Sequence, residues 1–151
     1  MATRVAVMSD SHGLLRPVVV AAVRGCDAVI HAGDLDEPRV LETLQGLAPV
    51  YVVRGNNDWT LPEGVPQRLA FRIEDCHFMM AHDKRDIPKA LDGVDVVIFG
   101  HSHIYHEEIV DGRLWLNPGS CGYRRFHSDL CYVIMTVEGH EVTIEKHYLE
   151  G

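Results

Sequence analysis

The sequence predicts an α/β domain in which two mixed β-sheets pack as a sandwich flanked by helices. In the first third, short runs rich in Val and Ile alternate with single helical patterns, which is typical of parallel strands joined by crossovers. After Asn57 the pattern changes to apolar runs joined by tight turns, which is typical of antiparallel strands. The 151 residues suffice for one full core but not for two ordinary domains, so we expect a single domain over residues 1–151.

The first third is expected to contain three strands and two helices. The runs, in order, are RVAVM at 4–8, a helical pattern at 14–24, DAVIHA at 27–32, a helix at 37–46 and PVYVVR at 49–54. Because single helices separate these strands, the three strands are predicted to be parallel.

The middle of the chain is expected to form a hairpin and one more buried strand. QRLAFRIED and CHFMMA have strand patterns, and Glu74 and Asp75 stand at the turn between them. A short helix near Ile87 to Leu91 is expected to lead into the apolar strand VDVVIFG.

The last third is expected to be mostly antiparallel strand. Turn signals at Asp111-Gly112 and Glu138-Gly139 separate the runs IYHEEIVD, GRLWLN, LCYVIMTVE and HEVTIEKHYL. An exposed apolar strand edge in this region would allow a homodimer or a higher homo-oligomer.

The charge balance, the cysteines and the hydropathy exclude several classes of protein. Lys and Arg number 14 against 22 Asp and Glu, and the net charge of -8 argues against a nucleic-acid backbone as the partner. The 4 cysteines form no C-x-x-C pair, so we expect reduced thiols rather than a zinc knuckle or a disulfide framework. No apolar run approaches the roughly 20 residues that span a membrane, and residues 1–15 lack a signal-peptide pattern. We therefore expect a cytoplasmic protein without a membrane partner.

Polar residues follow five of the predicted strands directly. They are Asp10 and His12, then Asp34, then Asn56, Asn57 and Asp58, then His82 and Asp83, and finally His101 and His103. Taken singly, an Asp after a strand is also typical of a helix cap, and Gly-Asn-Asn-Asp is also typical of a turn. Together they gather carboxylates and imidazoles where ligands bind in α/β sheets, beyond the carboxyl ends of the strands. A bound cation is therefore predicted.

The spacing of these residues indicates the kind of cation site. Asp10 and His12 lie two positions apart, as do His101 and His103, so in an extended chain each pair would leave one face and converge. Imidazole with carboxylate suits Mn, Fe, Zn, Co or Ni, and Mg remains an option. Seven ligands exceed the needs of one catalytic ion, which predicts two divalent ions, a usual device for in-line displacement at phosphorus.

The ordered set of motifs resembles the signature of the calcineurin-like metallophosphoesterases. The motifs are Asp10-x-His12, Gly33-Asp34, Gly55-Asn56-x-Asp58, His82 and Gly100-His101-x-His103. The short length and Asn117-Pro118-Gly119-Ser120 are similar to the small one-domain phosphodiesterase branch, which also includes the retromer metallophosphoesterase-like subunit. The resemblance implies an α-β-β-α fold with the site at the strand ends.

The resemblance also implies a ligand set and a reaction. Asp10, His12 and His103 would bind the first ion, Asn56, His82 and His101 the second, and Asp34 would bridge the two. The implied activity is that of a phosphodiesterase with a hydroxide bridged by two metals, manganese first among them, that attacks the phosphorus of a small phosphoester in line. Catalytic roles are expected for Asp58, Asn56 and His12. Asp58 would orient a ligand or the nucleophile, or else only stabilise its turn.

Three positions depart from the family pattern. Asn57 stands where many relatives carry a His that protonates the leaving group, and an amide cannot do so, which favours diesters or good leaving groups. Asp83 replaces the Gly usual after His82. Arg124 and Arg125 follow the Asn-Pro-Gly-Ser motif, and together with Asn57 they are the candidates for substrate contact.

The remaining histidines and the alternative functions stay open at this point. His31 is either a residue behind the site or a hydrogen-bonded core histidine, and His106 and His127 are either near the cleft or on the surface. The alternatives to a phosphodiesterase are a non-catalytic scaffold on the same fold, a phosphomonoesterase, and a metalloprotein of oxygen or redox chemistry. The full set of competent ligands favours the hydrolase.

Overall fold

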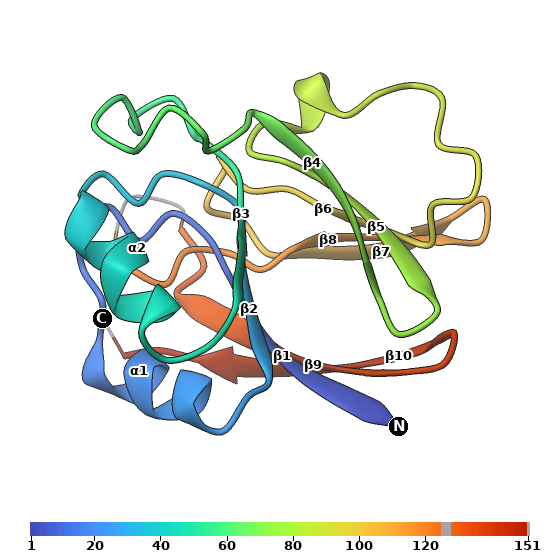
Figure 1. Ribbon diagram of the computed structural model, residues 1–151, viewed down its shortest axis with the longest axis horizontal. Helices are drawn as coiled ribbons and strands as arrows, with labels where there is room; N and C mark the ends of the chain where they lie inside the picture. The colour runs from blue at the N-terminus through green and yellow to red at the C-terminus, as the bar shows by residue number, and fades with distance from the viewer. Residues whose placement is uncertain (125–127, 151) are drawn as a thin grey trace.

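The computed structural model describes residues 1–124 and 128–150, which form two five-stranded sheets packed face to face (Figure 1). The first sheet has the strand order β10-β9-β1-β2-β3 and the second the order β4-β5-β6-β8-β7. The strands are β1 (Ala2–Met8), β2 (Ala28–His31), β3 (Val50–Val52), β4 (Arg68–Ile73), β5 (Cys76–Ala81), β6 (Val96–Ile98), β7 (His106–Val110), β8 (Arg113–Asn117), β9 (Cys131–Glu138) and β10 (Glu141–Tyr148). The helices are α1 (Pro17–Arg24), α2 (Pro38–Gln45) and a 3-10 turn at Lys84–Asp86.

Both sheets are mixed, as the sequence predicts. β1, β2 and β3 are parallel, and β9 and β10 continue that sheet in antiparallel pairing. In the second sheet β5, β6 and β8 are parallel, with β4 and β7 antiparallel at its edges. The expected turns at Glu74-Asp75 and Asp111-Gly112 join β4 to β5 and β7 to β8, and positive φ angles at Glu74, Asp111 and Gly112 fit such tight turns.

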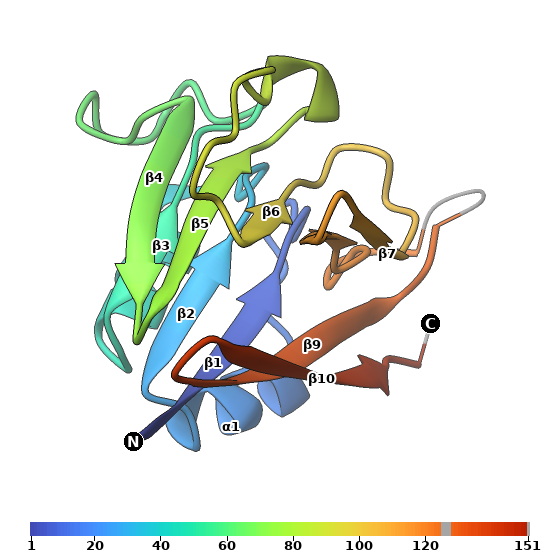
Figure 2. The same cartoon turned by 90° about the vertical axis from the view of Figure 1, so that its right-hand side faces the viewer.

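Apolar layers explain how the elements pack. The layer between the sheets contains Phe78 and Ile98 from one sheet and Val7 and Ile30 from the other. A second layer, which includes Met8 and the α2 residue Leu44, lies between the first sheet and its helices. Figures 1 and 2 show α1 against that sheet, on the side away from the second sheet. The sandwich and its flanking helices are thus confirmed, with both α-helices on one sheet.

The helix expected near Ile87 to Leu91 is wrong. The helical turn lies earlier, at Lys84–Asp86, and Ile87 has the extended angles φ -69° and ψ 128°. Pro88 explains this, because the residue before a proline is disfavoured from helical geometry. The segment is still useful to the fold, since Ile87 and Leu91 are buried over Val97 on the outer face of the second sheet.

The two α-helices begin at prolines. α1 begins at Pro17 rather than at residue 14, and α2 begins at Pro38. Proline has a suitable fixed φ and needs no N–H partner in the first turn, so it starts a helix there. Residues 9–16 and 32–37 are consequently free to form the loops that follow β1 and β2.

Candidate metal centre

The loops after β1, β2, β5 and β6 meet where the two sheets end together. The backbone N–H of Asp10 donates to the carbonyl of Gly33, and that of Gly100 donates to the carbonyl of His82. The backbone N–H of His101 then donates to the Oδ2 atom of Asp10 at 3.1 Å, which joins the two sheets. The strand ends and loops that carry the candidate ligands are therefore held against one another.

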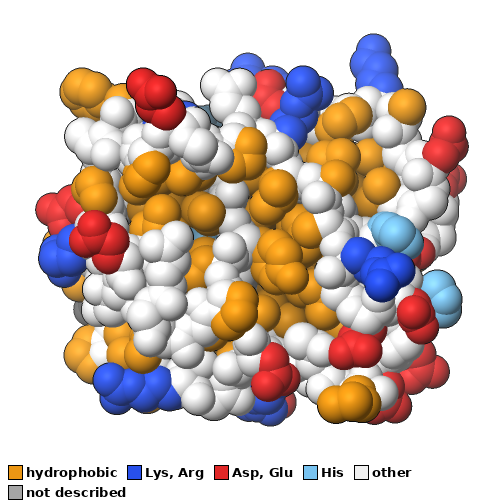
Figure 3. Space-filling view, in the orientation of Figure 1, with side chains coloured by type: hydrophobic (Ala, Val, Ile, Leu, Met, Phe, Trp, Pro, Cys, Tyr) orange, Lys and Arg blue, Asp and Glu red, His pale blue; other side chains and the backbone are white. Residues whose placement is uncertain are grey.

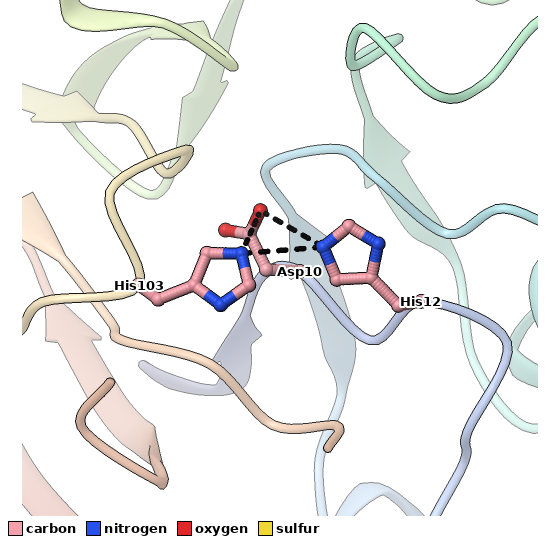
Figure 4. A group of neighbouring side chains, drawn as sticks. All are labelled: Asp10, His12 and His103. Carbon is pink, nitrogen blue, oxygen red and sulfur yellow. Dashed lines mark hydrogen bonds and ion pairs between the residues drawn. The ribbon is translucent and has the colours of Figure 1, made fainter. Parts of the chain in front are cut away.

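Asp10 lies at the centre of the group. Its Oδ1 atom is 3.3 Å from Nε2 of His103 and 3.7 Å from Nε2 of His12. The two histidine Nε2 atoms lie 3.2 Å apart, and Figure 4 shows both rings directed at the same carboxylate. The ligand atoms of these three side chains lie close enough together to hold one cation.

A second group shares Asp10 and adds Asp34 and His82. The Oδ2 atom of Asp34 lies 3.2 Å from Nε2 of His82 and 3.7 Å from Nε2 of His12. Nε2 of His82 is also 3.7 Å from Oδ1 of Asp10. The carboxylates of Asp34 and Asp10 thus each lie near histidines of both groups, and the bridging role expected of Asp34 stays a prediction.

The buried polar atoms of this cluster fit a bound cation. Asp10 is fully buried and His82 is 4% exposed, yet Asp10 Oδ1 and His82 Nε2 make no hydrogen bond and have only ion-pair contacts at 3.2–3.7 Å. Burial of such atoms without a hydrogen bond is costly, and a metal ion would satisfy them. The donor set, imidazole nitrogen with carboxylate oxygen and no thiolate, suits a divalent transition metal.

Hydrogen bonds behind the cluster aim the ligand atoms inward. Nδ1 of His82 donates to the carbonyl of Ala32 at 2.8 Å, so its Nε2 faces the centre. Nδ1 of His12 pairs with Oδ2 of Asp36 at 2.9 Å, which orients that ring in the same way. Oδ2 of Asp10 accepts from the hydroxyl of Ser9 at 2.7 Å and leaves Oδ1 for the centre. Such partners commonly orient metal ligands.

The electrostatics of the cluster show carboxylates and imidazoles that hold one another charged. Burial opposes ionisation of Asp10, but contacts with His103 and His12 hold its pKa well below the ordinary value. Burial likewise lowers the pKa of His82, but contact with Asp34 and the charge of Asp10 raise it to about 9. Since metal ligation needs neutral imidazole, a dication binding here would displace protons.

The backbone at the site differs from the extended chain that the spacing argument assumed. Asp10, His12, His101 and His103 have φ between 48° and 76°, in the left-handed region. Alternation along a strand therefore does not bring these pairs together, and that expectation is wrong. Non-glycine residues rarely adopt this conformation, and such strained positions cluster at functional sites.

Asp58 shapes the loop that carries Asp34. Its Oδ2 atom accepts the backbone N–H groups of Asp34 and Gly55 at 2.7 and 2.8 Å, and its Oδ1 accepts that of Asp36 at 2.8 Å. The side chain is completely buried. Its contacts are thus with the backbone of the ligand loop rather than with the open centre.

Asn56 and His101 lie on the wall of a cleft beside the cluster. The cleft has a volume of about 280 Å³, and its lining also includes His82, Asp83 and Arg85. The ring of His101 stands edge-on to that of His82, with centroids 5.2 Å apart. Both Asn56 and His101 are exposed, and so they are less enclosed than the other five candidate ligands.

The residues expected to contact substrate are placed as follows. The backbone N–H of Asn57 donates to Oδ1 of Asp34 at 3.0 Å, and its side-chain Nδ2 lies 3.5 Å from Oδ2. Arg124 is exposed and does not line the cleft. Arg125 and His127 lie outside the described residues. Asp36, Gln67 and Arg85 also lie beside the cluster or the cleft, although each stands outside the five strand-end motifs of the sequence.

The remaining histidines and the cysteines have ordinary structural settings. His31 is fully buried and bonded to the Ser11 hydroxyl and the Gly33 N–H, so it is a hydrogen-bonded core residue directly behind the site. His106 pairs with Glu108 on an edge strand. The four cysteines, all of them in the described part of the chain, are free. The helices among residues 1–124 and 128–150 are too short to cross a membrane.

Comparison with known proteins identifies the family. The family model for the calcineurin-like phosphoesterase superfamily domain matches residues 3–140. The probable metallophosphoesterase YsnB of Bacillus subtilis is 32% identical over 154 residues, which cover 93% of this chain and 88% of that protein. The solved structure of an archaeal phosphodiesterase has a TM-score of 0.76 and 26% identity, covering 97% of this chain and 99% of that one.

The fold is also shared with a protein of sorting function. Vacuolar Protein Sorting 29 from Cryptosporidium parvum has a TM-score of 0.79 at 16% identity, with 99% of each chain covered. At that identity the likeness concerns the fold alone. The match of the family model over nearly the whole sequence, with the ligand cluster where the strands end, shows that this chain belongs to the calcineurin-like phosphoesterase superfamily.

Proposed function

We propose that the protein is a metal-dependent phosphodiesterase with two divalent ions at the centre described above. One observation carries the proposal: buried ligand atoms of Asp10, His12, Asp34, His82 and His103 converge within a few ångströms, and two of those atoms have no hydrogen-bond partner. In a scaffold without bound metal, burial of these carboxylates and imidazoles would cost free energy that no ion offsets.

The two groups of side chains suggest how the ions are held. Asp10, His12 and His103 would hold the first ion, in agreement with their mutual contacts. His82 would hold the second, with His101 and Asn56 as the further ligands from the cleft wall. Asp34 is proposed as the bridging residue because its Oδ2 lies close to Nε2 of both His12 and His82. Manganese is the first choice, with Fe, Zn, Ni, Co and Mg as alternatives.

The bound ions would supply a water of lowered pKa as nucleophile and neutralise charge that develops on the phosphoryl oxygens. The protein orients the ligands through Asp36 and Ala32 and shapes the Asp34 loop through Asp58. Asn57 lies beside Asp34, where its amide can donate a hydrogen bond but cannot protonate a leaving group. This favours diesters or substrates with good leaving groups over phosphomonoesters.

Hydrolysis of bis(p-nitrophenyl) phosphate tests the proposal. We expect activity stimulated by manganese or nickel that is lost in Asp34→Asn and His101→Ala. Asp75→Asn and His140→Ala change exposed residues of the same types in the turns that follow β4 and β9, and they should retain activity. Full turnover by metal-stripped protein would contradict the metal-dependent mechanism.

Anomalous scattering from manganese-loaded crystals tests the number of ions. Two peaks on either side of Asp34 are expected. A single peak, or a peak away from Asp34, would contradict the two-ion site. The alternative of a non-catalytic scaffold, to which the shared fold of a vacuolar sorting protein gives support, predicts bound metal without hydrolysis of any diester.

A further inference from the structure

The cleft beside His82 and His101 adjoins a second hollow. The first is lined by Arg54, Gly55, Asn56, Gln67, His82, Asp83, Arg85, Asp86 and His101. The second, of about 240 Å³, is lined by Gln67, Arg68, Arg85, Asp86 and Ile87. Because Gln67, Arg85 and Asp86 line both, the two hollows adjoin, and together they are called the path that leads from His82 and His101 to Ile87. In Figure 1 the loop after β3 and the 3-10 turn lie along the same upper edge of the molecule.

Asp83 holds Arg85 at the mouth of this path. The Nε atom of Arg85 lies 3.2 Å from each carboxylate oxygen of Asp83, and its Nη2 lies 2.7 Å from Oδ2. The Asp83 side chain also accepts the backbone N–H of Arg85 at 2.9 Å, which caps the start of the 3-10 turn. The same carboxylate lies 3.8 Å from Nε2 of His101. Arg85 is thus tied to the wall that carries a proposed metal ligand.

Arg85 keeps more donors available to a ligand than its neighbour Arg54 does. Arg54 donates to the backbone carbonyls of Asp58, Pro62 and Val65 and so closes the loop after β3. The Arg85 side chain is 84% exposed, and within residues 1–124 and 128–150 its side-chain hydrogen bonds are all to Asp83. A guanidinium has five N–H donors in a planar fork, so several remain for a ligand.

The lining of the path indicates what kind of group it would bind. Asn56 and Gln67 offer amide donors and acceptors, Arg85 offers donors, and Asp86 offers an acceptor. No Phe, Tyr or Trp is among the described residues that line either hollow. A nucleobase gains about 1–3 kcal/mol from stacking on an aromatic ring, and the rings that line this path, the imidazoles of His82 and His101, are the proposed metal ligands. Away from these two rings, the neighbouring donors and acceptors suit a chain of hydroxyl groups.

We propose that this path binds a hydroxyl-bearing ester group of the phosphodiester, such as a glycerol unit, and that Arg85 is its main hydrogen-bond donor. The proposal rests on the proposed function, because it places the phosphate at the metal centre. Asp83 is the positioning residue that keeps the guanidinium at the mouth of the path.

Inhibition of bis(p-nitrophenyl) phosphate hydrolysis measures the binding directly. In manganese-loaded protein, bis-glycerol phosphate is expected to compete with an inhibition constant at least about tenfold lower than that of dipropyl phosphate, which has the same carbon chain without hydroxyls. Arg85→Gln should raise the constant for bis-glycerol phosphate about tenfold and leave that for dipropyl phosphate within about twofold. Arg24→Gln, at an exposed arginine at the end of α1, is the matched control and should change neither.

The outcomes separate the two proposals. If the wild type did not hydrolyse bis(p-nitrophenyl) phosphate, both the proposed function and this inference would be refuted. Hydrolysis with equal inhibition by the two diesters would overturn the hydroxyl-binding path alone. An equal weakening of both diesters in Arg85→Gln would show that Arg85 contacts the phosphate instead. Asp83→Asn should raise the constant for bis-glycerol phosphate in the same direction as Arg85→Gln, and an unchanged constant would contradict its positioning role.

Discussion

The Nδ1 atom of His12 lies 2.9 Å from Oδ2 of Asp36, while Nε2 of the same ring faces Asp10 and His103. Asp36 is itself fixed, because its backbone N–H donates to Asp58. A carboxylate behind a histidine fixes the ring orientation and makes the opposite nitrogen a better ligand. Asp36 is therefore expected to act on the proposed metal centre through His12.

Asp36→Asn is expected to weaken manganese binding by about 10- to 100-fold, because the amide cannot replace the charge behind His12. Calorimetric titration of metal-stripped protein with manganese measures the affinity. Glu37→Gln, which removes a neighbouring exposed carboxylate, is the control and should bind as the wild type does. Equal affinities in Asp36→Asn and wild type would contradict the role.

Asp58→Ala is expected to destabilise the protein even without metal. The carboxylate accepts three backbone N–H groups in a completely buried setting, and each group left unpaired costs about 1–3 kcal/mol. Urea denaturation of metal-stripped protein should show a loss of at least about 3 kcal/mol. Asp75→Ala, at an exposed turn, should stay within about 0.5 kcal/mol of the wild type. An unchanged free energy of unfolding in Asp58→Ala would mean that the residue acts only in the reaction.

Acid should weaken the fold through His31. Nδ1 of His31 accepts the N–H of Gly33 at 3.1 Å and its Nε2 donates to the Ser11 hydroxyl at 3.0 Å, so the ring is neutral in the fold. Burial lowers its pKa from 6.5 to about 4. The unfolded chain then binds more protons between these values, and the stabilisation, complete above about pH 6.5, is lost as the pH falls through about 4.

A variant without a titrating group separates His31 from the carboxylates. Its contribution to the pH dependence amounts to about 3 kcal/mol. Glutamine can keep both hydrogen bonds but does not titrate. Between pH 6.5 and 4, the free energy of unfolding of His31→Gln should therefore fall by about 3 kcal/mol less than that of the wild type. Parallel pH profiles for the wild type and His31→Gln would refute the assignment.

Gly55→Ala is expected to abolish metal binding at the Asp34 side of the centre. A Cβ atom at position 55 would lie 2.2 Å from Oδ1 of Asp34 and 2.5 Å from its backbone N, closer than atoms approach. Gly64→Ala, in the same loop, meets nothing within 4 Å and serves as the matched control. Manganese titration and thermal unfolding of both variants give the test. Normal metal affinity in Gly55→Ala would show that the Asp34 loop adjusts without loss.

Much of the fold could be predicted because its signals are local. Apolar runs gave the strands, and tight turns such as Asp111-Gly112 gave the hairpins, since a two-residue connection fixes the pairing of its neighbours. The short helix near Ile87 was wrong because Pro88 outweighed the apolar pattern, although the pattern correctly marked a buried segment. The first helix begins at Pro17 rather than at residue 14 because proline favours the first turn of a helix.

The candidate site could be predicted in part, and the reasons differ between residues. Asp10 and His103 come together because the order of the strands places their loops side by side, which the strand-end motifs predict. The left-handed backbone at both residues was not predictable, since nothing in their residue types demands it. Asp36 and Arg85 were missed because their importance depends on contacts across the fold, with His12 and with the cleft.

Residues from both sheets hold the strand end that carries Asp10. The hydroxyl of Ser120 donates to the carbonyl of Asp10, and a Cβ atom at Gly100 would lie 2.1 Å from the hydroxyl of Ser9. The distance from Asp10 to His103 therefore depends on how closely the sheets pack, which side chains such as Phe78 determine from within. Larger side chains between the sheets would increase the distances between the proposed metal ligands, although those side chains do not belong to the site. Substitutions in the interior and in the site are therefore expected to depend on one another. A redesign for thermal stability would accordingly have to select for ion affinity in the same experiment.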